Sequence, residues 1–179
     1  MDATEREFVL HLLEAKRELL LSAISGLTSE HRDFRPRPDC WSVSDCVEHI
    51  TLVETRVMDS IERRLKSAPE PEKAAAVAGK EKLILRAVPE RGTRVKAPEA
   101  VTPTGRWPDF AELVGEFRKA RERSLRFAAE TEADLRSHFF PHTVFQDLDC
   151  YQWLVFLGAH CERHVLQIEE IRADPAFPD

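Results

Sequence analysis

The chain has 179 residues, of which 42% are hydrophobic and 32% are charged, a composition that excludes a disordered or fibrous protein. Its 26 basic and 32 acidic residues give a net charge of −6, which argues against a general nucleic-acid binder, because such proteins present a basic face to phosphate groups. The charged first residues and the lack of any run of about 18 apolar residues argue against secretion and against a membrane-spanning helix.

The first predicted helix begins near Thr4, where Thr4 and Glu7 have the spacing of a capping box, and it ends near Gly26. Its apolar residues recur every three or four positions, as on one face of a helix. Two prolines in the segment 35–41 then predict a connector. Ser42 is typical of a helix N-cap, and the second predicted helix follows it with an apolar stripe of Val43, Cys46, Val47, Ile50, Val53, Val57, Ile61 and Leu65.

The segment 67–106 has a looser pattern, which predicts a short helix followed by an irregular stretch rich in proline and glycine. At roughly forty residues it is longer than the usual loop between antiparallel neighbours, so it can carry the chain from one end of a bundle to the other. Its basic residues could form a pocket for an anionic substrate, although the interspersed glutamates favour a solvated segment. These basic residues are Lys80, Lys82, Arg86, Arg91, Arg94 and Lys96.

Two further helices are predicted in the last third of the chain. Pro108 fits the first turn of the third helix, whose apolar face continues to Ala128. Asp149 and Gln152 have the spacing of a second capping box, and the last helix follows them to about Ala173. No segment shows the alternation of a strand. The fold class predicted is therefore all-α, a four-helix bundle with a long crossover between helices two and three, in one domain over residues 1–179.

The four cysteines are Cys40, Cys46, Cys150 and Cys161, and their spacing matches no disulfide framework. Free thiols are therefore expected, as is typical of a protein in the reducing cytoplasm.

The last predicted helix carries His160 and His164 on the apolar stripe that faces the core. Residues four apart lie on one face of a helix, so both imidazoles can reach a single ion. Two buried histidines with ordinary hydrogen-bond partners are the competing interpretation. A shared cation is favoured, because each polar ring in a dry core needs its own partner and one ion satisfies both.

His49 is the predicted third ligand, because it lies at the edge of the apolar stripe of helix two, although a surface histidine is the alternative. The other polar residues near these positions are not predicted to be ligands. His11 and His31 are expected at the surface, Cys46 and Cys161 in the packing, and Glu162 in solvent, while His138 and His142 lie in a loop that could approach the site.

Two segments resemble the DinB-like (YfiT-like) metalloenzymes. They are Trp41-Ser-Val-Ser-Asp-Cys-Val-Glu-His-Ile50 in helix two and the stretch from Tyr151 to Ile168 in the last helix, and the segments 95–99 and 103–105 are also similar to one branch. The resemblance implies a bundle with up-down-down-up connectivity, a divalent metal on His49, His160 and His164, and a homodimer. The family pattern His-Pro-x-Phe-Gly before the last helix is replaced here by Pro-His-Thr-Val-Phe-Gln at 141–146, which puts a substrate contact there in doubt.

Three imidazoles leave a tetrahedral ion one open position, which is typical of a catalytic site. Related groups include a maleylpyruvate isomerase and S-transferases that use bacillithiol, mycothiol or glutathione, so we expect a metal-dependent transferase that uses a low-molecular-weight thiol. The alternatives are a hydrolase that uses metal-bound water, a non-catalytic bundle stabilised by its metal, and a bundle with no metal. Zinc is the first expectation, and nickel, iron or copper also suit imidazole ligands. The expected partner is a small-molecule substrate, with no nucleic acid and no membrane.

Overall fold

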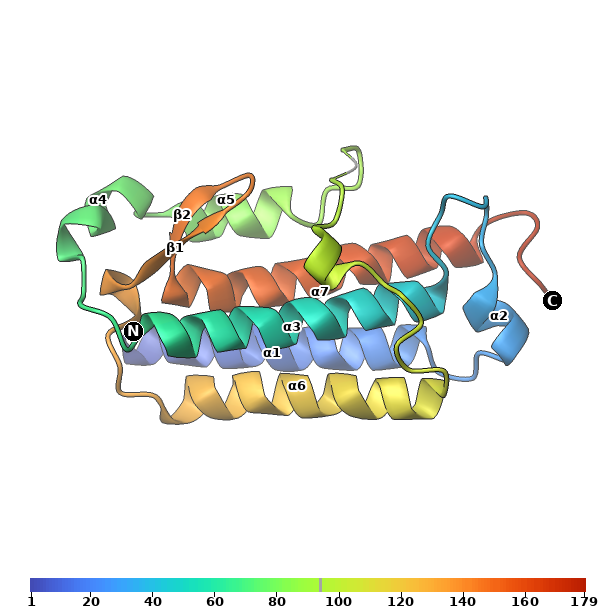
Figure 1. The fold of residues 1–179 in the computed structure, drawn as a ribbon, viewed down its shortest axis with the longest axis horizontal. Coiled ribbons are helices and arrows are strands. Elements are labelled where there is room, and N and C mark those ends of the chain that lie inside the picture. Colours follow the sequence, from blue (N-terminus) through green and yellow to red (C-terminus); the bar gives the residue numbers. More distant parts are fainter. Residues whose placement is uncertain (94) are drawn as a thin grey trace.

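The predicted helical bundle is confirmed. The computed structural model describes residues 1–93 and 95–179, and these contain four long helices packed side by side (Figure 1). The helices are α1 (Ala3–Ala23), α3 (Val43–Arg64), α6 (Phe110–Glu130) and α7 (Cys150–Arg172). Each buries a stripe of apolar residues against its neighbours, as the helical periodicity of the sequence predicts. Within the described ranges, no helix is long and apolar enough to cross a membrane.

The connectivity of the bundle is up-down-down-up. Helix α1 packs against α6 and α7, and α3 packs against the same two helices, so α1 and α3 lie on opposite corners. Helices α3 and α6 are consecutive among the four but run in the same direction (Figure 1). The chain must therefore return along the length of the bundle between them, which is the reason for the long crossover.

The crossover contains short helices that cover one side of the bundle. They are η1 (Pro71–Lys73), α4 (Ala74–Val77), α5 (Lys80–Ala87) and η2 (Glu99–Val101), where η denotes a 3₁₀ helix. Helix α5 packs against α7, and η2 contacts α3. Val77, Ile84 and Val101 are buried, so apolar contacts hold the crossover against the bundle.

A short two-stranded sheet, which the sequence pattern did not indicate, accompanies the helices. Strands β1 (Phe139–His142) and β2 (Gln146–Asp149) form an antiparallel hairpin just before α7, with Phe139 paired to Asp149. Strands of four residues are too short to show a clear alternation in the sequence, and Pro141 further obscures the pattern. The 3₁₀ helix η3 (Leu135–Ser137) precedes the hairpin.

Three local features at helix starts also differ from the prediction. The capping box of α1 is formed by Asp2 and Glu5, two residues before the predicted pair Thr4 and Glu7. Both pairs have the spacing of a capping box, so the spacing alone does not distinguish them. Helix α6 is capped by Asp109, so Pro108 precedes the helix. The short helix α2 (Ser29–Asp33), with Thr28 as its cap, was not predicted. The predicted caps Ser42 and Asp149 are both confirmed.

A buried ion pair joins three of the four helices. Arg121 of α6 is fully buried and donates to Glu54 Oε2 of α3 at 2.8 Å, and Glu54 itself is 1% exposed. Arg121 also donates to the carbonyl oxygen of Leu13 in α1 at 2.8 Å, and Ser124 donates to the other oxygen of Glu54 at 2.6 Å. The pair therefore links α1, α3 and α6 at the centre of the bundle.

All four cysteines are free, as predicted, and three of them are buried. Burial raises the pKa of Cys150 to about 12 and that of Cys161 to about 11, and it also raises the pKa of Cys46. Because the thiolate is the reactive form, these three thiols are expected to be inert in the folded protein.

A colorimetric thiol reagent should modify one thiol quickly in native protein and four after denaturation. Cys40→Ser should remove the fast reaction, and a fast reaction of two or more native thiols would contradict this assignment.

Candidate metal centre

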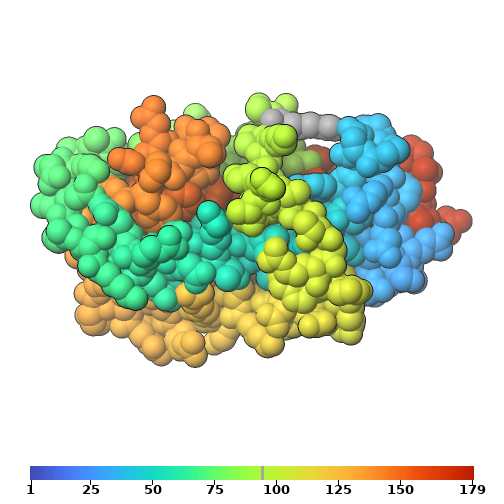
Figure 2. Space-filling view, viewed as in Figure 1, coloured from blue at the N-terminus to red at the C-terminus, as the bar shows by residue number. Residues whose placement is uncertain are grey.

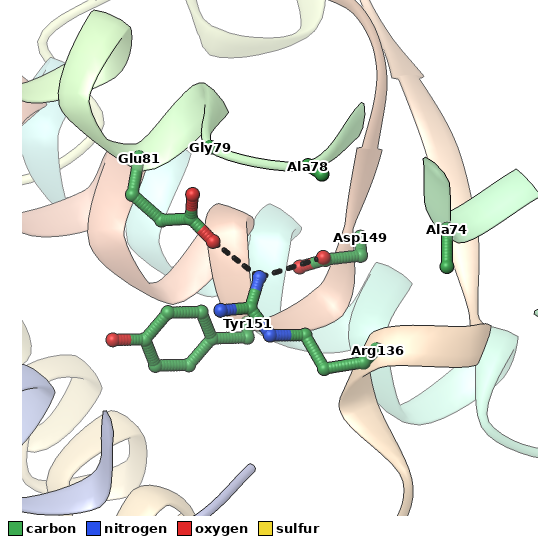
Figure 3. Close-up of a pocket in the computed structure, with 7 residues that line it drawn as sticks. All are labelled: Ala74, Ala78, Gly79, Glu81, Arg136, Asp149 and Tyr151. Carbon is green, nitrogen blue, oxygen red and sulfur yellow. Dashed lines mark hydrogen bonds and ion pairs between the residues drawn. The ribbon is translucent and has the colours of Figure 1, made fainter. Parts of the chain in front are cut away.

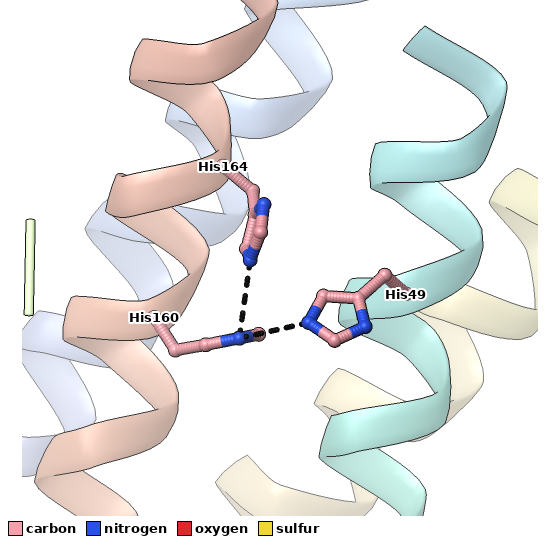
Figure 4. Close-up of side chains that lie close together, drawn as sticks. All are labelled: His49, His160 and His164. Atoms are coloured by element: carbon pink, nitrogen blue, oxygen red, sulfur yellow. Dashed lines mark hydrogen bonds between the residues drawn. The ribbon is translucent and has the colours of Figure 1, made fainter. Parts of the chain in front are cut away.

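Three histidines converge between α3 and α7 (Figure 4). Helix α3 supplies His49, and two successive turns of α7 supply His160 and His164. The side chains are almost completely buried, with exposed fractions of 5%, 9% and 5% respectively. His49 is therefore inside the bundle, not at the surface, and the structure brings together the three residues that the sequence predicts as ligands.

The nitrogen atoms of the three rings are spaced as the ligands of one ion would be. His160 Nε2 lies 3.2 Å from His49 Nε2 and 3.2 Å from His164 Nε2. A tetrahedral zinc ion with Zn–N bonds of about 2.0–2.1 Å holds its ligand nitrogens about 3.3–3.4 Å apart. The observed spacing is close to this value, so an ion could bind with only small shifts of the side chains.

Hydrogen bonds at Nδ1 of His49 and of His164 orient these two rings so that the Nε2 lone pairs point toward the middle of the histidine cluster. His49 Nδ1 lies 2.7 Å from the carbonyl oxygen of Val101, and His164 Nδ1 lies 3.0 Å from Gln167 Oε1. Both oxygens accept, so we assign the ring proton to Nδ1 and a lone pair to Nε2 in each case. Arg91 also donates to Gln167 Oε1, at 3.3 Å, which supports the orientation of that amide.

His160 cannot satisfy both of these lone pairs. A neutral His160 has one ring proton, so its Nε2 can donate at most one hydrogen bond to the two facing nitrogens. At least one buried lone pair is then left without a donor, which costs free energy in a dry core. One cation accepts all three lone pairs, so this donor set fits a divalent metal ion.

The electrostatic environment keeps the three imidazoles neutral near pH 7. Burial lowers the pKa of His49 and lowers the pKa values of His160 and His164 well below the usual value. The neighbouring imidazoles lower the last two pKa values further. Neutral imidazole is the form that binds metal, so the environment favours coordination over protonation.

Two aromatic rings, those of Trp41 and Phe156, pack against the cluster. The centre of the Trp41 ring lies 4.7 Å from that of the His49 ring and 5.8 Å from that of the His164 ring. The centre of the Phe156 ring lies 5.2 Å from that of the His160 ring. These rings limit the access of water, which strengthens electrostatic interactions at the centre.

The ring of Phe156 separates His142 from the cluster. The ring centre of His142 lies 4.8 Å from that of Phe156, and Phe156 in turn packs against His160. Its Nδ1 accepts hydrogen bonds from the backbone N–H groups of Val144 and Phe145 at 3.0 and 3.2 Å. The ring proton is therefore on Nε2, and burial lowers the pKa of His142 to about 4. His138 does not approach the cluster, since its two ring nitrogens face the carbonyl oxygens of Asp134 and Ser67.

The hairpin and the η2 segment flank the cluster. They cover the same side of the bundle at different points along α7 (Figure 1), and the surface is hollowed between them (Figure 2). Val101 of η2 contacts His49, and His142 of the hairpin contacts Phe156, one turn before His160.

The other residues considered in the sequence occupy different places. His11 is exposed, and His31 is half-buried, where its Nδ1 accepts from the backbone N–H of Thr28 as part of the α2 cap. Cys46 and Cys161 lie in the core as predicted. Glu162 is partly exposed and pairs with Lys16 at 2.9 Å, so it is not close to the three histidines.

The basic residues of the crossover do not form one anion pocket in the described ranges. Lys80 donates to the carbonyl oxygens of Phe145 and Asp147, and Arg91 pairs with Glu170 at 2.8 Å. Lys82, Arg86 and Lys96 are exposed, and Arg94 lies outside the described residues.

Residues that support the cluster were not identified from the sequence. They are Val101, Gln167 and Trp41, of which Gln167 and Trp41 appeared only as part of a family resemblance. Gln167 could have been found, because it lies three residues after His164 on the same helical face. The role of Val101 depends on where the crossover packs, and no local pattern indicates it.

A cavity of about 410 Å³ lies at the other end of the crossover, beside the start of α7 (Figure 3). Arg136 on its wall donates to Glu5, Glu81 and Asp149, and its guanidinium lies 4.2 Å from the centre of the Tyr151 ring. The guanidinium is thus already paired with three carboxylates. This arrangement joins α1, α5 and α7, and it fits a structural role better than a binding site.

The fold and the cluster together define a four-helix bundle with three converging imidazoles on its second and last long helices. A family model for the DinB superfamily matches residues 12–168, and the chain belongs to that superfamily. The resemblance noted in the sequence is thereby confirmed. The chain is 26% identical over 149 residues to the uncharacterized protein YuaE of Bacillus subtilis (strain 168). The aligned region covers 83% of this chain and 88% of YuaE.

Two solved structures share the fold. One is the four-helix bundle protein TT2238, with a TM-score of 0.60, 21% identity, and coverage of 92% of this chain and 98% of that one. The other is YfiT from Bacillus subtilis, with a TM-score of 0.60, 16% identity, and coverage of 96% of this chain and 88% of that one. Similarity at these identities demonstrates a common fold.

Proposed function

We propose that the protein binds one divalent metal ion on His49, His160 and His164, with zinc as the first choice and nickel, iron or copper as alternatives. The observation that carries this proposal is the convergence of three buried Nε2 atoms, two of which present lone pairs that His160 cannot satisfy together. The spacing of 3.2 Å within two pairs of these atoms supports a tetrahedral ion.

We further propose that the protein is a metal-dependent transferase that acts on a low-molecular-weight thiol. Three neutral ligands leave the positive charge of the ion uncompensated and one position open, and an ion of this kind supplies Lewis acidity to a thiol or a water molecule. Val101 and Gln167 orient His49 and His164, while Trp41 and Phe156 limit water. The preference for a thiol comes from the resemblance to thiol-dependent members of the family.

A metal-dependent hydrolase is the second candidate. It is favoured by the structural neighbour YfiT, which is described as a probable metal-dependent hydrolase with an unusual four-helix bundle topology. A non-catalytic bundle stabilised by its metal is the third. Under each of these functions the proposal includes a cytoplasmic homodimer, and the two enzymatic candidates also require a small-molecule substrate.

The test begins with metal content. Protein purified without an affinity tag should contain about one divalent ion per chain by elemental analysis, whereas a nickel column could load the site artificially. Protein that stays metal-free after equilibration with zinc, nickel, iron and copper at neutral pH would refute all three functions.

Activity assays then separate the candidates. Metal-loaded protein is incubated with an electrophilic aryl halide and, in turn, glutathione, bacillithiol or mycothiol, and we expect thiol consumption that a chelator stops. Hydrolysis of activated esters or amides without any thiol would favour the hydrolase. If neither reaction occurs and metal removal lowers the melting temperature, the site is structural. His160→Ala serves as the metal-free control in every assay.

A further inference from the structure

A short segment of the crossover is held against α3 beside the histidine cluster. We call residues 98–106 the strap; it includes η2 and leads to the start of α6. Glu48 of α3 is 3% exposed, and its carboxylate accepts hydrogen bonds from the backbone N–H groups of Thr104 at 2.9 Å, Gly105 at 3.0 Å and Arg106 at 3.3 Å. The hydroxyl of Thr104 lies 3.5 Å from the same carboxylate. A buried charge on α3 is thus compensated by backbone donors of the strap.

The next residue of α3 holds the same strap at a second point. His49 donates from Nδ1 to the carbonyl oxygen of Val101 at 2.7 Å, and Val101 is itself buried. Glu48 and His49 are therefore consecutive residues that bind the strap at two points, Glu48 through its carboxylate and His49 through its imidazole. The two points are three to five residues apart along the strap. Any movement of the strap away from α3 would release both contacts.

We propose that Glu48 is a positioning residue of the metal centre. By binding the N–H groups of 104–106, it fixes the strap so that the Val101 carbonyl holds His49 with its Nε2 toward His160 and His164. The affinity for the metal is thereby coupled to the order of the strap. The inference deepens the proposed function and rests on a metal binding at the three histidines.

The coupling has a direct physical basis. A histidine ligand binds metal more tightly when its other ring nitrogen donates to a fixed acceptor, and loss of such a partner lowers metal affinity by about 10- to 100-fold. Coupling between binding equilibria is reciprocal, so a strap held by Glu48 favours the metal and a bound metal favours the ordered strap.

The first test replaces the carboxylate by an amide. In Glu48→Gln one oxygen acceptor becomes an N–H₂ donor that faces backbone N–H groups, so the strap is held less firmly. We expect the dissociation constant for zinc, measured by competition with a chromophoric chelator, to rise about tenfold. Amide hydrogen exchange at 104–106 should become faster. The matched control is Glu99→Gln, the same change at an exposed side chain on the strap, which should alter neither quantity.

The second test weakens the strap without changing α3. Gly105 has a φ of +71° and open space where a Cβ would be placed, so Gly105→Ala strains the backbone without a clash. It should also weaken zinc binding and accelerate exchange at 104–106. Gly26→Ala is its control, because Gly26 has a φ of +73° and equally open surroundings in the loop after α1, away from the histidines. This control should leave zinc binding unchanged.

The outcomes distinguish the inference from the proposed function. If Glu48→Gln or Gly105→Ala accelerates exchange at 104–106 while zinc affinity is unchanged, the strap does not position His49 and the inference is overturned. If neither variant alters exchange, Glu48 does not hold the strap, and the inference is again overturned. A wild-type protein that binds no metal would refute the proposed function. In that case the inference is tested without metal, by the NMR signal of the His49 Nδ1 proton. Glu48→Gln should expose this proton to rapid exchange with water, and Glu99→Gln should not. A signal that Glu48→Gln leaves unaltered overturns the inference.

Discussion

His160→Ala is expected to weaken zinc binding strongly, because His160 Nε2 lies 3.2 Å from both of the other ligand nitrogens and is the member that joins them. Apparent binding free energies of about 10–16 kcal/mol in four-ligand zinc sites correspond to about 2.5–4 kcal/mol per ligand, so the dissociation constant should rise about 100- to 1,000-fold. The same loss is expected for His49→Ala and His164→Ala. Isothermal titration or chelator competition on purified protein measures the change.

The control for these variants is His11→Ala, which changes an exposed histidine and should retain the wild-type affinity. Far-UV circular dichroism should show that all four variants remain helical. If the site is catalytic, the three ligand variants should lose thiol consumption while staying folded. If the site is structural, they should chiefly lower the melting temperature. Stoichiometric, tight zinc binding by any of the three ligand variants would contradict the shared site.

Arg121→Met is expected to destabilise the protein by about 3–5 kcal/mol, because it leaves the carboxylate of Glu54 buried without its positive partner. The Arg121 and Glu54 side chains have exposed fractions of only 0% and 1%, so water cannot replace the lost hydrogen bond. Arg121→Met also removes the donor to the Leu13 carbonyl, which adds to the cost. The free energy of unfolding from urea titrations measures the change.

The same helix offers a matched control. Arg123 pairs with Asp59 and Glu62 at 2.7 and 2.9 Å, but its side chain is 31% exposed, so Arg123→Met should cost about 0–1 kcal/mol. The double variant Arg121→Met with Glu54→Leu should recover most of the lost stability, since it leaves no unpaired charge in the core. Equal losses for Arg121→Met and Arg123→Met would show that burial of the first pair has no special effect.

Arg121 also illustrates what could have been predicted from the sequence. It lies four residues after Phe117 and four before Leu125, on the apolar stripe of α6, so the helical periodicity already places a charged side chain on the buried face. Its partner could not be predicted in the same way. Glu54 is 67 residues away in the chain, and only the packing of α3 against α6 brings the two together.

The hairpin and the strap could not be predicted because their stability does not come from local periodicity. Strands β1 and β2 have four residues each, and their turn is held by His142, whose ring accepts two backbone N–H groups. The strap is irregular, and Glu48 and His49 of α3 hold it from outside. Segments of this kind are defined by tertiary contacts, which short sequence windows do not contain.

The sequence by itself determined the four long helices and the two histidines of α7, because apolar residues spaced every three or four positions and residues four apart are properties of a single helix. The sequence also indicated His49 as the third ligand, with a surface histidine as the alternative. The tertiary structure alone decided that His49 is buried beside His160 and His164, that Val101 orients it, and that Glu48 holds the strap. The physical reason is distance along the chain. Contacts between residues 52 to 111 positions apart depend on how the helices pack and where the crossover runs, and no local pattern encodes either.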